Sequence, residues 1–382
     1  MKEYVKDVDL WVFFATKIAN VESFKLKFNC YSESSYEFPQ FAYKNTLLKN
    51  LVFWYCQLKP CGNVNWTSQV SLKIGRVELT DGAMEKVLSG CPNLDCLKLD
   101  VFSGIHRLEI SSAKLRKLII KDYYHWCDDL WLEILAPFIQ TLQLLGHCSD
   151  VCLPHGNVPS LVTTVLHLGF GFDFDEEDDD EGDQNLEKQY SNMKQCLHSV
   201  AHVENLELSP WFIECLSILE LKGWQFPPSS RKFLELSVAF KQLDFPGICS
   251  FLQSSLDLET LVIEWYDNRP RDLLSRYTNE DEQTRRFETH NFNCSFPYLK
   301  TIKIINFYGS VLPLVKYLLK HATVLEQFVI VAAFNESDVS SDYESDGSLD
   351  YERYVSPDYV EMALELLSFP RSSPHASVIF SY

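Results

Sequence analysis

The sequence lacks the short motifs that mark the common classes of enzyme. It has no Gly-x-Ser-x-Gly turn for a nucleophilic serine, no glycine-rich loop for a phosphate group and no dinucleotide-binding fingerprint. Carboxylates are numerous, yet none forms the spaced pair that is typical of general acid–base catalysis. These absences predict a protein that is not an enzyme and that holds no cofactor and no metal ion.

Long apolar runs are also missing. The short apolar segment at residues 10–15 follows the acidic Asp7 and Asp9, without the basic start or the cleavage site of a signal peptide. No later segment is long and apolar enough to span a membrane. The 12 cysteines include no Cys-x-x-Cys pair, and several occupy positions that suit a small buried residue. We therefore expect reduced thiols and an intracellular location, in the nucleus or the cytoplasm.

Positive charge is scarce relative to negative charge. The chain of 382 residues has 34 lysines and arginines against 53 aspartates and glutamates, which gives a net charge of -19. A field of that sign repels nucleic acid and anionic membrane surfaces, and it attracts basic partners. The composition therefore argues against nucleic-acid and membrane partners.

What the sequence does contain is a repeat, and residues 84–99 show one unit of it. Met84, Val87 and Leu88 follow helical spacing, and the Gly-Cys-Pro that comes next ends the helix. The segment then continues as Leu-x-x-Leu-x-Leu, which is the strand entry of a leucine-rich repeat. One helix and one strand therefore make one repeat.

Similar strand cores recur along the chain. They lie at residues 21–26, 48–58, 72–79, 105–110, 115–120, 139–144, 165–168, 203–208, 216–221, 234–236, 243–245, 258–263, 299–304, 325–330 and 378–380. Since each repeat enters its strand in the same direction, the sequence predicts an α/β leucine-rich-repeat solenoid, with a curved parallel sheet on the concave side and irregular helices on the convex side. Where two cores lie only about 10 residues apart, a short bend should replace the helix.

Three polar segments interrupt this pattern. They are an acidic loop at residues 172–183, a polar insertion at 267–293 and an acidic, serine-rich loop at 335–350. A helix at residues 4–19 should cap the N-terminal end of the solenoid. We place a leucine-rich-repeat region at residues 1–294 and a closing αβ cap at residues 295–382.

Three stretches carry a more specific pattern: Leu-Ser-Gly-Cys-Pro-Asn-Leu at residues 88–94, the strand core and Ser-Ser pair at 105–112, and Val-Glu-Asn-Leu at 203–206. Together they resemble the leucine-rich region of plant F-box/LRR-repeat proteins. The end of the chain resembles the FBD region that often closes these proteins, through residues 299–302, 315–322 and 367–374. The resemblance implies a protein-binding module similar to the substrate-recognition part of an SCF-type (Skp–cullin–F-box) ubiquitin ligase adaptor.

Proteins of that family usually begin with an F-box, which docks a Skp-type adaptor. Before its first repeat this chain shows neither the Leu-Pro-x-x-Leu helix start nor the Ser-x-Arg-Trp ending of that segment. Two interpretations remain: a longer product carries the F-box, or the chain is a stand-alone scaffold or competitor that binds targets without delivering them. A small-molecule co-receptor, like the related auxin and jasmonate receptors, ranks last because the expected concave residues are acidic.

The residue between the last two apolar positions of each strand core should face solvent on the concave side. Taken strand by strand, these residues are Lys98, Glu109, Ile119, Gln143, Glu207, Glu220, Glu235 and Asp244. Four consecutive carboxylates in the second half predict a groove for a partner segment that is rich in lysine or arginine. The alternative is that these carboxylates only solvate an exposed strand face.

One residue is a candidate for regulation. Ser341 lies in the loop at 335–350, where the sequence Ser-Asp-Tyr-Glu suits acidophilic kinases. Phosphorylation there would add a charge of about -1.5 to -2. The alternative is that this loop is a passive linker.

Overall fold

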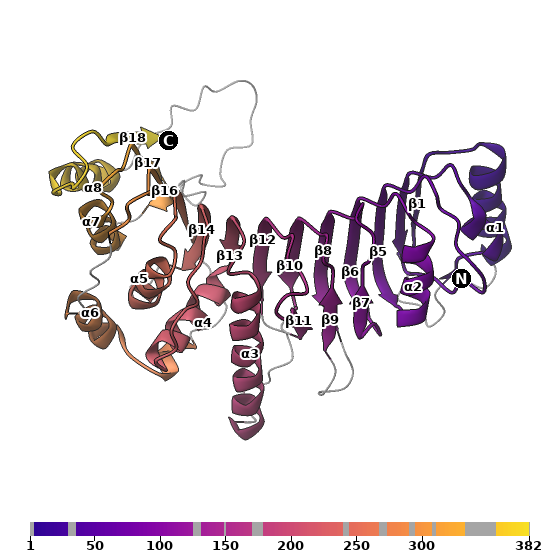
Figure 1. The fold of residues 1–382 in the computed structure, drawn as a ribbon, viewed down its shortest axis with the longest axis horizontal. Coiled ribbons are helices and arrows are strands. Elements are labelled where there is room, and N and C mark those ends of the chain that lie inside the picture. The colour runs from indigo at the N-terminus through magenta and orange to yellow at the C-terminus, as the bar shows by residue number, and fades with distance from the viewer. Residues whose placement is uncertain are drawn as a thin grey trace, which may run out of the picture. The chain divides into compact units, whose positions relative to one another are not determined.

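The computed structural model describes residues 4–29, 36–124, 131–148, 150–169, 179–239, 244–266, 273–289, 295–307, 311–332 and 357–381. The chain divides into two compact units, Met1–Val203 and Glu204–Tyr382, which we call unit 1 and unit 2. In Figure 1 the colour follows the chain from indigo at the start of unit 1 to yellow at the end of unit 2.

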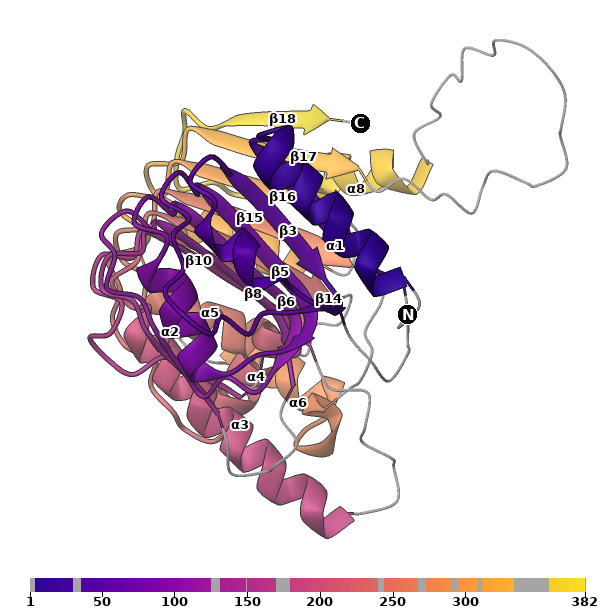
Figure 2. The same cartoon turned by 90° about the vertical axis from the view of Figure 1, so that its right-hand side faces the viewer.

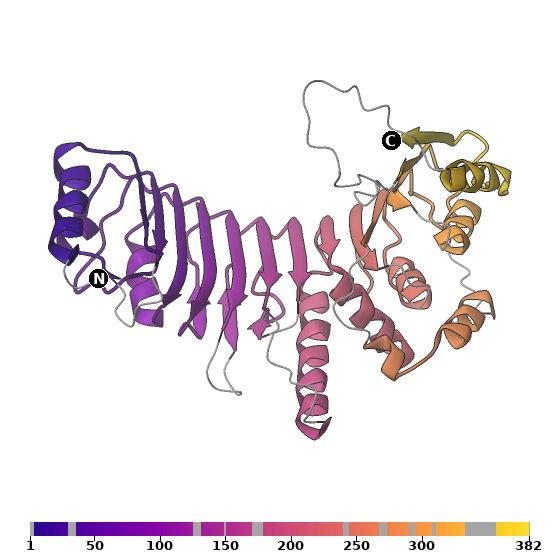
Figure 3. The same cartoon turned by 180° about the vertical axis from the view of Figure 1, so that it is seen from behind.

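The core of unit 1 is a parallel sheet whose strands follow the order of the chain (Figure 1). The strands are β1 (Ser23–Lys27), β3 (Asn50–Trp54), β5 (Ser71–Glu78), β6 (Cys96–Ser103), β8 (Lys117–Tyr123), β10 (Thr141–Gly146) and β12 (Thr163–Leu168). Each strand pairs in parallel with the next, and Figure 3 shows them side by side. The parallel sheet expected from the repeat is confirmed for these strands.

Alternation sets the two faces of this sheet. In β6 the side chains of Leu97 and Leu99 are fully buried, whereas those of Cys96 and Lys98 are half-buried. Because the leucines of neighbouring strands stack in register, one face of the sheet builds a continuous apolar core. We call the opposite face, which carries the half-buried and exposed side chains, the open face.

Unit 1 also contains a second, shorter parallel sheet. Its strands are β7 (Arg107–Glu109), β9 (Leu132–Leu135) and β11 (Val151–Cys152), and a separate pair joins β2 (Tyr36–Glu37) to β4 (Cys56–Gln57). Leu108 and Ile134 of this sheet are buried, and the hydroxyl of Tyr123 in β8 donates a hydrogen bond to the carbonyl of Ile105 at 2.9 Å. The closely spaced strand cores therefore alternate between two sheets, instead of being joined by short bends within one sheet.

The placement of residues 105–110 in the concave sheet is therefore wrong, since this segment contains β7. Both sheets bury alternate side chains in one interior, so both produce the same Leu-x-x-Leu-x-Leu pattern. The sequence pattern reports burial, and burial alone does not tell the two sheets apart.

The first helices of unit 1 match the expectation. The helix α1 (Val5–Phe13) continues as the π-helical turn η2 (Phe14–Ile18) and lies at the β1 end of the sheet (Figure 2). The 3-10 helix η3 (Gln40–Lys44) contacts α1. The helix α2 (Asp81–Ser89) follows Thr80, whose hydroxyl oxygen accepts a hydrogen bond from the amide of Ala83 at 3.2 Å. The helices predicted at residues 4–19 and after Thr80 are therefore confirmed.

The helix α3 (Asp179–Ser199) begins inside the segment 172–183, which we predicted as an acidic loop. Negative side chains are favourable in the first turn of a helix because they interact with its dipole, so an acidic run is compatible with a helix start. The part of the predicted loop before Asp179 lies outside the described residues. Near the end of α3, the hydroxyl of Ser199 donates to the carbonyl of Leu153 at 2.6 Å.

Unit 2 is built on parallel strands that again follow chain order. They are β13 (Asn205–Leu208), β14 (Phe233–Ala239), β15 (Thr260–Tyr266), β16 (Thr301–Phe307), β17 (Gln327–Ala332) and β18 (Ser377–Ser381). The helices are α4 (Pro210–Leu221), α5 (Phe245–Gln253), α6 (Glu280–Thr289), α7 (Leu312–His321) and α8 (Pro357–Ser368), with a 3-10 turn η5 (Leu274–Arg276). Figure 1 shows α4, α5 and α7 on one side of these strands.

Two segments of unit 2 that we predicted as strands are helical. Residues 216–221 belong to α4, and Asp244 with Phe245 lies at the start of α5. Nine of the 12 residues of α4 are buried, Glu214 and Ser217 among them, so its burial has no period that separates helix from strand. The polar insertion at 267–293 contains η5 and α6, while the loop predicted at 335–350 lies outside the described residues.

Candidate protein-binding faces

The open face of unit 1 carries two neighbouring rows of side chains. The strand register runs along the first row through Lys25, Val52, Lys73, Lys98, Ile119, Gln143 and Val165. Two positions further along each strand, the second row begins with Lys27, Trp54, Gly75, Asp100 and Lys121. The structure thus places Lys98 and Gln143 in one row, as expected, and it adds lysines on earlier strands.

Trp54 lies at the centre of these positive side chains. The Nζ atom of Lys73 is 4.9 Å from the centre of the indole ring, and the Nζ atom of Lys27 is 5.6 Å from it. The guanidinium carbon of Arg76 lies 5.9 Å from the same ring. Because the face of an indole ring attracts cations, Trp54 gathers three positive groups. A Cβ atom at Gly75 would lie 3.2 Å from the indole, so the glycine gives the ring room against the sheet.

Asp100 is a buried carboxylate beneath this cluster. Its side chain is 6% exposed, and one of its oxygens lies 3.4 Å from the Nζ atom of Lys73 and 3.6 Å from that of Lys98. Asp100 therefore orients two lysines and offsets part of their charge. Within the described part of the chain, Lys25, Lys27 and Arg76 have no ion pair with a carboxylate.

A backbone kink recurs next to the second row. Tyr55, Arg76, Val101 and Asp122 have φ angles of 54°, 51°, 55° and 52°. Residues with a side chain rarely adopt such left-handed angles. Since Trp54, Gly75, Asp100 and Lys121 are aligned across the sheet, the kink recurs at one register. It leaves Arg76 exposed beside Trp54, while the following Val77 is buried again.

In β13 of unit 2, buried and half-buried side chains also alternate, and we call the half-buried side the open face of unit 2; it carries a smaller, acidic cluster. Glu207 on β13 lies directly opposite Glu235 on β14, and Glu264 lies on β15 in the next row. Partial burial raises the pKa of Glu235, and the neighbouring charges of Glu207 and Glu264 raise it further, whereas Lys303 lowers it. This part of the predicted acidic ladder therefore contains Glu207, Glu235 and the unpredicted Glu264.

Two other members of the predicted ladder do not lie on a strand. Glu220 is in α4, where its carboxylate accepts hydrogen bonds at 2.8 and 2.9 Å from one nitrogen of Arg286 in α6. Asp244 precedes α5 and is buried; the hydroxyl of Ser217 lies 3.4 Å from its carboxylate. Both assignments to the concave face are wrong, because the apolar spacing around each residue arises from a buried helix.

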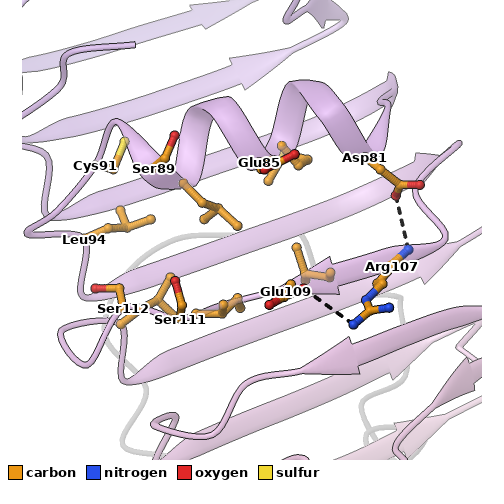
Figure 4. Close-up of a pocket in the computed structure, with 14 residues that line it drawn as sticks. Asp81, Glu85, Ser89, Cys91, Leu94, Arg107, Glu109, Ser111 and Ser112 are labelled. Carbon is orange, nitrogen blue, oxygen red and sulfur yellow. Dashed lines mark hydrogen bonds and ion pairs between the residues drawn. The ribbon is translucent and has the colours of Figure 1, made fainter. Parts of the chain in front are cut away.

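Glu109 is also misplaced, since β7 belongs to the second sheet. Its carboxylate lies 3.6 Å from the guanidinium of Arg107, at the edge of a cavity of about 420 Å³ between α2 and β7 (Figure 4). The carboxylate of Asp81 accepts a hydrogen bond from the amide of Arg107 at 3.1 Å. The carboxylates of Asp81, Glu85 and Glu109 and the guanidinium of Arg107 line this cavity, so its charged groups are of both signs and mainly negative.

The sequence contained a signal for part of the positive cluster. Lys25 occupies the position between the last two apolar residues of the strand core at 21–26, so the rule that gave Lys98 also applies to it. Lys73 lies between the first two apolar residues of the core at 72–79, and the same alternation places it on the open face. Alternation alone places Trp54 on the open face, next to the buried Phe53, whereas Arg76 joins the cluster through the kink, which no apolar spacing reveals. Ser341 lies outside the described residues.

The described ranges show neither a group of metal-binding side chains nor a helix that could span a membrane. Among the residues that the structure describes, no three His, Cys, Asp or Glu side chains are grouped to hold a metal ion. None of the described helices combines the length and the apolar character needed to cross a membrane.

Known proteins resemble this chain over part of its length. Residues 11–166 match the leucine-rich repeats described as "FBD-associated F-box protein At5g56370, LRR repeats". The F-box/LRR-repeat protein At3g03360 of Arabidopsis thaliana is 30% identical over 265 residues, which cover 67% of this chain and 52% of the relative. The F-box/LRR-repeat protein At5g02910 of the same plant is 29% identical over 253 residues, covering 64% and 51%. The chain thus spans about half the length of these curated relatives.

Proposed function

The leucine-rich repeats of this chain belong to the plant F-box/LRR-repeat family, and on that premise we propose that the chain is the partner-recognising module of an SCF-type ubiquitin ligase adaptor. The observation that carries the proposal is the match of residues 11–166 to the repeats of an FBD-associated F-box protein. The parallel sheet of unit 1, with one apolar face and one open face, supports a role in protein binding.

The proposed mechanism is binding without bond making or bond breaking. Packed strands hold the side chains of the open face at fixed spacings, so a partner meets a surface that needs little reorganisation. The candidate contact residues are Lys98 and Gln143 in unit 1 and Glu207 and Glu235 in unit 2. The acidic pair in unit 2 would receive a lysine- or arginine-rich segment of a substrate protein.

For the architecture we propose a repeat solenoid at residues 1–294 and an FBD-like αβ cap at residues 295–382. The recurring strand register supports the solenoid. The alternation of β16, α7, β17, α8 and β18 at the end of the chain supports an αβ cap. Solenoids of this kind commonly carry atypical terminal elements that cover the last repeat.

The test uses the full-length product of the native gene, tagged and expressed in plant cells. We expect it to co-purify with a Skp-type adaptor, a cullin and at least one further protein whose abundance rises when the gene is silenced. Specific partners without a Skp-type adaptor would instead support the alternative function, a stand-alone scaffold or competitor. A product that captures no specific protein would contradict both functions.

A further inference from the structure

We propose that the open face of unit 1 around Trp54 binds an acidic, extended segment of a partner protein. The side chains that would receive its carboxylates are Lys25, Lys27, Lys73 and Arg76. The proposal rests on the proposed protein-binding function and names the chemistry of one partner. It differs from what the net charge of -19 predicts, which is a basic partner.

The first argument is the unbalanced charge of this face. Asp100 is buried and already lies close to two lysine ammonium groups, so it does not offset the charge of more distant cations. Lys25, Lys27 and Arg76 are exposed, and within the described ranges none of them has an ion pair with a carboxylate. Like charges on neighbouring strands repel one another, and carboxylates from a partner would relieve that repulsion.

The second argument is the spacing of the cations. Lys25 in β1 and Lys73 in β5 share one row and are separated by β3. Neighbouring strands lie about 4.8 Å apart, so these two positions are about 10 Å apart across the sheet. A peptide in the extended polyproline II conformation advances about 3.1 Å per residue with three residues per turn, so carboxylates on every third residue would lie on one side and match this spacing.

The third argument is the aromatic centre of the cluster. Trp54 is half-buried, its indole lies close to Gly75, and the cations of Lys73 and Arg76 are 4.9 and 5.9 Å from the ring centre. Rigid aromatic side chains and arginines are enriched where proteins bind one another. An apolar side chain between two acidic residues of the partner would therefore find a preformed contact on the indole.

The small extent of the cluster favours an acidic peptide over a nucleic acid. A nucleic acid carries phosphates along its whole length, so it would extend beyond a few strands towards the surface of a strongly acidic protein. A short peptide segment places its carboxylates only where the cations are.

The test measures binding of a fluorescein-labelled peptide of about 12 residues, with Asp or Glu at every third position, to the full chain by fluorescence anisotropy. The informative variant combines Lys25→Glu with Arg76→Glu, both at exposed positions. The matched control combines Lys86→Glu in α2 with Lys114→Glu, which makes the same change in net charge elsewhere in unit 1. Thermal melts of all three proteins check that they fold equally.

We expect the wild-type chain to bind the peptide, the open-face variant to bind it about tenfold more weakly, and the control to remain within about twofold. Equal weakening in variant and control would overturn the proposal, because net charge alone would then explain binding. Tighter binding of a lysine-substituted peptide, or of a 12-nucleotide single-stranded DNA, would also overturn it. Either result would leave co-purification with a Skp-type adaptor unaffected. The acidic-segment site can therefore be contradicted without contradicting the proposed adaptor function.

Discussion

Arg231 is a buried cation in the core of unit 2. Its side chain is 1% exposed, and its guanidinium carbon lies 4.6 Å from the centre of the Phe251 ring. Among the described residues, the Nε and Nη1 atoms have no hydrogen-bond partner. Burial lowers the pKa of the guanidinium to about 9. Because the unfolded chain keeps the ordinary pKa, this residue opposes folding most strongly below pH 9, and the effect declines as the pH rises above 9.

We therefore predict that Arg231→Met stabilises unit 2. Methionine fills a similar volume without a buried charge, so the free energy of unfolding at pH 7 should rise by about 1–4 kcal/mol. Urea titration of the purified chain measures this change, and Arg116→Met, at an exposed position, serves as the control with an expected change of less than about 0.5 kcal/mol. A loss of stability in Arg231→Met would show that the guanidinium has a partner that compensates its burial.

Glu235 gives a pH-dependent prediction. The raised pKa means that the folded chain keeps a proton that the unfolded chain has already released, so stability falls as the pH rises between the ordinary and the raised pKa. Glu235→Gln removes this effect and should raise the melting temperature at pH 7 but not at pH 3.5. Calorimetry at pH 7 and at pH 3.5 measures the melting temperatures, with Glu365→Gln on the exposed side of α8 as the control. An equal shift at both values would rule out titration of Glu235 as the cause.

At the scale of elements, α4 and α5 approach each other closely at Gly247. A Cβ atom there would lie 2.6 Å from the Cα atom of Ser217 in α4. Gly82 in α2 serves as the comparison, because a Cβ atom there would meet no atom within 4 Å. Close packing of two helices therefore requires a glycine at position 247, whereas packing does not require one at position 82.

We predict opposite effects of alanine at these two glycines. Gly247→Ala forces the two helices apart and should lower the free energy of unfolding by about 1–3 kcal/mol. Gly82→Ala only restricts the unfolded chain and should raise it by about 0.4–1 kcal/mol. Urea titrations of both variants against the wild-type chain check the signs. If Gly247→Ala is neutral, α4 and α5 are not as closely packed as described.

The contact between α4 and α6 rests on Glu220 and Arg286. Their side chains are 13% and 28% exposed, and both carboxylate oxygens accept hydrogen bonds. A double-mutant cycle with Glu220→Gln and Arg286→Gln should give a coupling free energy of about 1–2 kcal/mol. The exposed pair Lys232 and Glu204, 3.7 Å apart, should give less than about 0.5 kcal/mol. Equal coupling in both pairs would contradict a structural role for the first.

Elements differ in how well apolar spacing predicts them. Residues 96–99 alternate half-buried and buried side chains, and this period of two is enough to place Lys98 on the open face. In α4 nine of the 12 residues are buried, so burial carries no period, and the strand predicted around Glu220 is wrong for that reason. In β7 the period is correct, yet it cannot tell which of two sheets the strand joins, and Glu109 was misplaced for that reason.

At the scale of the whole molecule, basic side chains are distributed unevenly, and the net charge does not show this. The chain carries 53 acidic and 34 basic residues, yet Lys25, Lys27, Lys73 and Arg76 gather on one face of unit 1. Net charge could not predict this cluster, because it depends on strand register and, for Arg76, on the kink at that residue. The parallel order of the strands could be predicted, because each repeat carries the same pattern in the same direction.

The central claim is that the open face of unit 1 recognises partner proteins. The most direct measurement compares the proteins that co-purify from plant cells with the full-length wild-type product, with the product carrying Lys25→Glu and Arg76→Glu, and with the control carrying Lys86→Glu and Lys114→Glu. We predict that at least one partner with an acidic segment is lost from the open-face variant and retained by the control. An identical set of partners for all three products would contradict the claim.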